Sequence, residues 1–107
     1  MYSSKVLKVI DGDTLKVQID LGFEIFCVTN IRLGRIDAPE IKGPERPQGL
    51  ISKAELTEFI DDQEILIQST EKGKYGRYIA EVWIQKGETW ININNWLLEN
   101  ELAVPYD

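Results

Sequence analysis

Three short segments of the chain combine acidic side chains with arginines. They read Asp-Gly-Asp-Thr at residues 11–14, Arg-Leu-Gly-Arg-Ile-Asp-Ala-Pro-Glu at residues 32–40 and Tyr-Gly-Arg at residues 75–77. Carboxylate oxygens are natural ligands for Ca²⁺ or Mg²⁺. The planar guanidinium of arginine grips a phosphate with two hydrogen bonds and stabilises negative charge that grows there during reaction. Together these groups supply what metal-assisted cleavage of a phosphodiester bond requires.

Each segment alone also has an ordinary structural explanation. Asp-Gly is among the commonest hairpin turns, so Asp13 by itself favours a turn over a metal site. Asp37 and Glu40 flank the stiff residue Pro39 and fit an Asx turn or a helix start. Arg77 alone is typical of a surface charge at the start of a strand. The combination of the segments is what indicates a site.

Two neighbouring arginines differ in their surroundings. Arg32 lies within the apolar alternation of a predicted strand, where a charge needs a partner or a function. A structural salt bridge is the alternative for this residue. Arg35 stands two residues before Asp37, and we expect it to point towards solvent and to have a structural role.

The composition is that of one ordinary globular domain over residues 1–107, because 43% of the residues are apolar and 28% are charged. The chain holds no apolar run long enough for a membrane span, and its first residues lack the apolar region of a signal peptide. We therefore expect a cytoplasmic protein that does not bind membranes. The sequence does not reveal the oligomeric state, for which a monomer is the expectation. The absence of histidine argues against a catalytic zinc site and against a Ser-His or Cys-His nucleophile.

The net charge of −6 argues against a protein that coats nucleic acid by general electrostatics. A bound Ca²⁺ would reverse the local sign, and basic residues form two local groups: Lys42, Arg46 and Lys53, and Lys72, Lys74 and Arg77. We expect weak, salt-sensitive substrate binding. The single cysteine, Cys27, lies in an apolar run, which predicts a buried and inert thiol.

The hydrophobic pattern predicts five strands, at residues 5–10, 14–19, 23–33, 64–69 and 78–84. The proline-rich stretch 38–48 predicts a surface loop. An amphipathic helix is predicted over residues 50–60, with core contacts from Leu50, Ala54, Leu56, Phe59 and Ile60. A second helix is predicted from Ile93 to about Asn100, with Asn92 as its cap. These elements fit an α+β, mainly β fold, a five-stranded Greek-key barrel with two helices, although other small α+β folds fit the propensities comparably well.

The order and spacing of the three motifs resemble those of the staphylococcal nuclease (thermonuclease, SNase-like) family, over roughly residues 5–104. The resemblance implies an OB-fold and a Ca²⁺-dependent nuclease that hydrolyses DNA or RNA, with Mg²⁺ or Mn²⁺ as alternatives. It implies that Asp13, Asp37 and the backbone carbonyl of Ala38 ligate the metal, and that Glu40 orients or deprotonates the attacking water.

By the same resemblance, Arg32 and Arg77 bind the scissile phosphate and stabilise its five-coordinate transition state. Arg77 also assists the leaving 5′ oxygen, and the products carry 3′-phosphates. Tyr75, Lys42 and Lys74 are expected to contact a single-stranded DNA or RNA substrate.

The chain departs from the family pattern in four places. Ala38 replaces a threonine, and Gly73 replaces an acidic residue found in many members. The chain ends at Asp107, as expected of a compact variant without the third C-terminal helix. Glu101 stands where a glycine often follows the last helix, so a positive φ is expected at Glu101 or Asn100.

Two other functions compete with catalysis. A non-catalytic OB-type module could bind nucleic acid or protein, but such domains usually lose the catalytic groups that are kept here. An acidic mimic of nucleic acid would explain the net charge but not the arginines.

Overall fold

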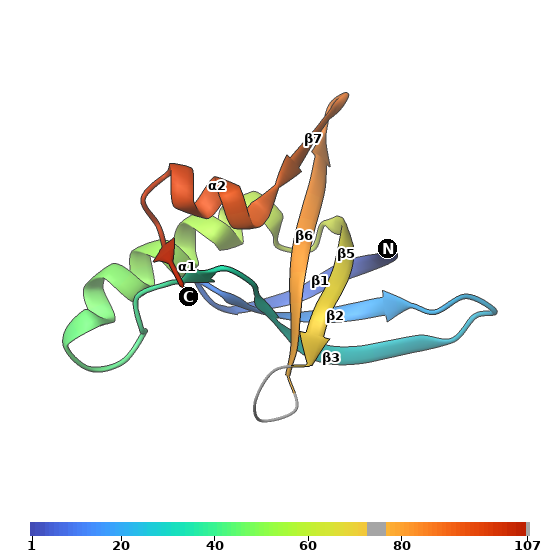
Figure 1. The fold of residues 1–107 in the computed structure, drawn as a ribbon, viewed down its shortest axis with the longest axis horizontal. Helices are drawn as coiled ribbons and strands as arrows, with labels where there is room; N and C mark the ends of the chain where they lie inside the picture. The colour runs from blue at the N-terminus through green and yellow to red at the C-terminus, as the bar shows by residue number, and fades with distance from the viewer. Residues whose placement is uncertain (73–76, 107) are drawn as a thin grey trace.

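The computed structural model describes residues 1–72 and 77–106, with the backbone alone at residues 71 and 72. Its main feature is a closed five-stranded barrel with two helices, as Figure 1 shows. The five strands are β1 (Tyr2–Asp11), β2 (Thr14–Asp20), β3 (Phe26–Leu33), β5 (Glu64–Lys72) and β6 (Tyr78–Lys86). Parallel pairing of β3 with β6 closes the barrel, and every other neighbouring pair is antiparallel. This arrangement confirms the predicted OB-fold.

Three short strands and two helices complete the part of the chain that the structure describes. Strand β4 (Ile36–Asp37) pairs with β8 (Val104–Pro105), and β7 (Thr89–Asn92) extends the sheet beyond β6. Helix α1 (Arg46–Ile60) follows a 3₁₀ turn at Gly43–Glu45, and α2 (Ile93–Glu99) follows β7. The short strands were not predicted, because two to four residues carry too little alternation to be recognised.

The core fills the barrel and the space beneath both helices. Alternating side chains of β1, β2, β3 and β6 point inwards, among them the fully buried Val6, Leu15, Val17, Leu33 and Val82. Leu56 and Ile60 of α1 and Ile93 and Leu97 of α2 are also fully buried. Phe59 stacks on Trp96 with ring centroids 4.3 Å apart, which joins the two helices. Burial of each of these Val, Leu and Ile side chains stabilises the fold by roughly 2 kcal/mol.

The prediction that β3 begins at residue 23 is wrong. Phe23 and Glu24 have φ values of 55° and 63° and form the turn of the β2–β3 hairpin, which extends beyond the barrel (Figure 1). The apolar run around Cys27 therefore has no core to enter, and Cys27 is half-buried rather than buried. Its neighbours Phe26 and Val28 are both more than half exposed.

The predicted loop 38–48 is too long. The 3₁₀ turn and the first residues of α1 occupy residues 43–48, because Pro44 and Pro47 stand in first-turn positions, where a missing N–H costs nothing. Leu50 and Ala54 are exposed, which corrects their assignment to the core. The buried stripe of α1 is Gly49, Ser52, Leu56 and Ile60.

Both ends of α2 follow the sequence prediction. The side chain of Asn92 accepts a hydrogen bond of 2.8 Å from the backbone N–H of Asn95. Glu101 has φ 58°, and the amides of Glu101 and Leu102 donate to the carbonyls of Leu98 and Leu97. This is a Schellman ending in which a glutamate holds the position that glycine prefers. No helix in the described ranges is long and apolar enough to cross a membrane.

Candidate active site

The turn that joins β1 to β2 presents Asp13 from a rigid backbone. Oδ1 of Asp11 accepts a hydrogen bond of 3.0 Å from the amide of Asp13, which is an Asx turn. A Cβ on Gly12 would lie 2.7 Å from the Cβ of Ala38 and 3.0 Å from that of Ser52, so a larger residue would push the turn away from both. The motif therefore forms a turn, as the sequence predicts, and this turn places Asp13 in the candidate site.

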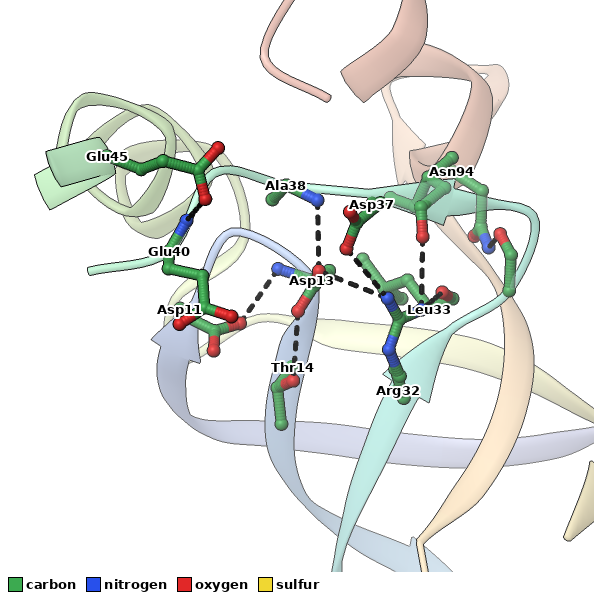
Figure 2. Close-up of polar contacts among 12 residues, drawn as sticks. Asp11, Asp13, Thr14, Arg32, Leu33, Asp37, Ala38, Glu40, Glu45 and Asn94 are labelled. Atoms are coloured by element: carbon green, nitrogen blue, oxygen red, sulfur yellow. Dashed lines mark hydrogen bonds and ion pairs between the residues drawn. The ribbon is translucent and has the colours of Figure 1, made fainter. Parts of the chain in front are cut away.

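Asp13 is buried and has several partners (Figure 2). Its Oδ1 accepts a hydrogen bond of 3.1 Å from the Thr14 hydroxyl, and its Oδ2 accepts one of 3.0 Å from the amide of Ala38. Burial, together with the hydrogen bond and negative charge of nearby Asp11, raises the pKa of Asp13 to about 6. The Ala38 amide and the Arg32 charge oppose this shift without cancelling it.

Arg32 lies at the centre of the site. Its Nη2 is 3.1 Å from Oδ1 of Asp37 and 3.5 Å from Oδ2 of Asp13. Its Nη1 donates hydrogen bonds of 3.0 Å to the carbonyls of Leu33 and Ile36. One guanidinium thus joins the β1–β2 turn to β3 and β4, and both carboxylates converge on a single nitrogen, as Figure 2 shows.

The short strands β4 and β8 position Asp37 and Ala38. Asp37 pairs with Val104 and Ile36 with Pro105, so the C-terminal segment holds the strand that carries the second carboxylate. The side chain of Asp37 is half exposed at 51%, whereas that of Asp13 is only 11% exposed. Of the two carboxylates that contact Arg32, one is therefore buried and the other accessible.

A cleft of about 370 Å³ contains most of the predicted site residues. Its lining includes Asp13, Arg32, Asp37, Ala38, Glu40, Lys42 and Arg77. Glu40 is exposed and lies on the Asp11 side of the cleft, away from Arg32, in Figure 2. Lys74 and Tyr75 lie outside the described residues. A larger cleft of about 600 Å³ near Phe26 and Trp90 contains no arginine, so the site chemistry belongs to the smaller one.

Helix α1 fixes the backbone at Glu40. Any Cβ on Gly49 would collide with the carbonyl of Glu40, so the helix packs directly against that peptide. The amide of Glu40 also donates a long hydrogen bond of 3.4 Å to Glu45. Helix α1 therefore fixes the position of the Glu40 backbone.

Arg35 lies outside the cleft lining. Its φ is 66°, and its guanidinium contacts both carboxylate oxygens of Glu81 at 3.0 and 2.6 Å and the side chain of Asn95 at 2.9 Å. The hydrogen bond to Glu81 raises the pKa of Arg35 above its usual range. Arg35 ties the β3–β4 turn to β6 and α2.

Sequence reasoning missed two residues of the site. Asp11 lines the cleft and sets the geometry of Asp13, and its place in the Asp-Gly-Asp motif was the signal. The ring of Tyr106 lies 5.2 Å from Cζ of Arg32, a cation–π distance. The sequence carried no signal for Tyr106, because pairing of β8 with β4 is what brings it there.

Comparison with known proteins agrees with this geometry. Residues 30–107, well over half of the chain, match the family described as staphylococcal nuclease homologue. The chain belongs to this family.

Three curated proteins are similar to this chain at low identity. A thermonuclease of Staphylococcus hyicus is 34% identical over 88 residues, which cover 77% of this chain and 48% of that protein. An uncharacterised protein of Methanocaldococcus jannaschii is 29% identical over 128 residues, 98% of this chain and 59% of the relative. Protein ParB of Escherichia coli is 29% identical over 80 residues, 75% and 41% of the two chains. The chain spans about half the length of these curated relatives.

Proposed function

We propose that this protein is a Ca²⁺-dependent nuclease that hydrolyses phosphodiester bonds of single-stranded DNA, RNA or both. The observation that carries the proposal is the convergence of the Asp13 and Asp37 carboxylates on Arg32, in a cleft that Glu40 and Arg77 also line. Metal-assisted cleavage of a phosphodiester bond requires such groups together. The similarity to a thermonuclease supports the same reaction.

The residues present fit a hard divalent cation. Two carboxylates that contact one guanidinium nitrogen are close enough for a single ion to bind both after small side-chain movements. Among the described residues no group of three or more acidic, His or Cys side chains is placed to hold a metal. We therefore assign the other ligands to the Ala38 carbonyl, to water and to the substrate phosphate, which suits an ion with six to eight oxygen ligands. Once bound, the ion supplies charge neutralisation at the phosphate.

The side chains of the protein have separate roles in the reaction. Glu40, exposed on the Asp11 side of the cleft, orients or deprotonates the attacking water. Arg32 and Arg77 hold the phosphate oxygens and stabilise charge in the transition state, with Arg77 on the leaving 5′ oxygen. Lys42, Lys74 and Tyr75 contact the flanking nucleotides. The reaction needs no covalent enzyme intermediate and leaves a 3′-phosphate.

One observation favours a binding module instead. Arg32 already has four protein acceptors, as a purely structural arginine would. In the nuclease, a cation would take over Asp13 and Asp37 and free Nη2 of Arg32 for the phosphate.

The test is incubation of end-labelled single-stranded DNA and RNA with Ca²⁺, Mg²⁺, Mn²⁺ or a chelator. The nuclease predicts cleavage with Ca²⁺, none with chelator, and products with 3′-phosphate ends. Strand binding without cleavage under every metal would establish the binding module.

A further inference from the structure

The β2–β3 hairpin leaves part of one strand edge open. β3 pairs with β2 along its length from Phe26 to Arg32, but its other side pairs with β6 only at Ile31–Leu33. Residues 26–30 therefore have β2 on one side and, in the part of the chain that the structure describes, no strand on the other. This segment lies in the hairpin that projects beyond the barrel (Figure 1). Among the described residues, no strand occupies its outward backbone groups, which can therefore pair with another strand.

This edge lacks the features that normally protect an edge strand. Natural sheets protect edges with lysines, prolines, bulges or very short strands. Residues 26–30 contain no charge and no proline, and the β2–β3 register runs from Asp20–Phe26 to Thr14–Arg32 without a shift. The other outer strand of the sheet, β7, has only four residues and is protected by its shortness.

The side chains beside the open edge are apolar and exposed. Phe26 is 53% exposed and Val28 54%, and Phe26 also lines the larger cleft. The turn adds Phe23 at 97% and Ile25 at 57%. Large apolar side chains grouped on one projecting ribbon mark an interaction surface.

The chemistry of the edge indicates what covers it. Unpaired strand groups are satisfied by an extended backbone rather than by a helix or a small ligand. The whole chain has a net charge of −6, but residues 26–30 carry no charge. Two copies can therefore meet at this segment without like charges facing each other. We propose that two copies of this protein pair antiparallel through residues 26–30, about a two-fold axis at Val28.

This register uses all five open residues. Val28 faces Val28 of the second copy, Cys27 faces Thr29, and Phe26 faces Asn30. Two-fold pairing closes on itself and gives a dimer, whereas pairing of β3 with β7 of another copy would propagate into chains. The candidate active site lies at the other end of β2 and β3, where Thr14 pairs with Arg32, so the dimer leaves the cleft open. The proposal replaces the expected monomer and is independent of the proposed function.

Sedimentation velocity over about 10 µM to about 1 mM tests the dimer, since small interfaces of this kind bind weakly. The mass should rise from 12.3 kDa towards twice that value, and more so at high salt, because salt screens the repulsion between acidic copies. Val28→Lys should weaken dimerisation at least about tenfold while the fold is kept, because lysine is tolerated on edges. Ile51→Lys, at a helix position of similar exposure, is the matched control and should change nothing.

Cross-linking tests the register. Thr29→Cys places a thiol opposite Cys27 of the second copy, so mild oxidation should give a disulfide-linked dimer that the wild type forms much more slowly. A monomer throughout the concentration range would overturn the proposal. So would equal weakening by Val28→Lys and Ile51→Lys, or growth into polymers larger than a dimer.

Discussion

The backbone amide of Ala38 donates a hydrogen bond of 3.0 Å to Oδ2 of Asp13, which stands 25 residues earlier. This contact joins the β1–β2 turn to the end of β4, so the two carboxylates of the candidate site are held by one backbone link. It also explains why alanine serves at position 38, because the contact uses the main chain. The site is built by backbone geometry as much as by side chains.

Asp13→Asn should stabilise the metal-free protein at pH 7. The folded-state pKa of Asp13 is raised from 3.8 to about 6, so the folded state binds more protons than the unfolded state between these values. The metal-free wild type therefore loses stability as the pH rises from about 4 to about 6, by on the order of 2 kcal/mol. Melting in chelator across this pH range measures the effect, and the variant should lack most of this slope.

The same variant should lose stabilisation by Ca²⁺. A cation that binds the folded wild type raises its melting temperature by mass action, whereas the neutral amide introduced by Asp13→Asn offers no anionic ligand. If Ca²⁺ raised the melting temperature of wild type and Asp13→Asn equally, Asp13 would not be a ligand.

Glu101→Gly should stabilise the protein by up to about 1 kcal/mol, because glycine adopts the positive φ at this Schellman position without the Cβ penalty. Denaturant unfolding measures the change. Asn100→Gly is the control, since Asn100 has φ −94° and gains nothing from glycine. A Glu101→Gly protein that unfolds at the same or lower denaturant concentration would refute the strain at this residue.

Gly49→Ala should destabilise by more than about 2 kcal/mol, because the new methyl group collides with the Glu40 carbonyl and forces α1 away. Ile51→Ala, at an exposed position of the same helix, should cost far less. In the folded fraction of Gly49→Ala, turnover should also fall, because Glu40 shifts. A well-folded, fully active variant would contradict the role of this contact.

Substrate binding should depend on metal, because an acidic chain offers few phosphate contacts outside the cleft. With a cleavage-deficient variant, affinity for single strands should fall sharply on chelation. The slope of log affinity against log salt should correspond to only a few phosphates. Tight metal-free binding with a steep slope would instead favour the binding module.

The five long strands could be predicted from the sequence because alternation marks them, whereas the choice of an OB-fold among small α+β folds rested on the motif resemblance. The motifs also single out Asp13, Arg32 and Asp37, which the structure brings together. Other features depend on tertiary context. The apolar run at residues 25–28 indicates burial, yet the hairpin carries it beyond the core. Tyr106 lies beside Arg32 because the preceding two-residue strand β8 pairs with β4, and no local sequence pattern predicts so short a strand. Pro44 and Pro47 are typical of a loop but open helical turns.

Turnover of Arg77→Lys is the sharpest test of the proposed nuclease reaction, because lysine keeps the charge and loses the two-pronged contact with phosphate. With Ca²⁺ and single-stranded DNA or RNA, we predict cleavage by wild type that chelator abolishes. Arg77→Lys should be roughly 10²-fold slower, with unchanged melting and Ca²⁺ binding. Arg35→Lys, outside the cleft, should lose some stability through Glu81 but keep near-normal turnover. Near-normal turnover in Arg77→Lys, an equal loss in Arg35→Lys, or no cleavage by the wild type would contradict the account.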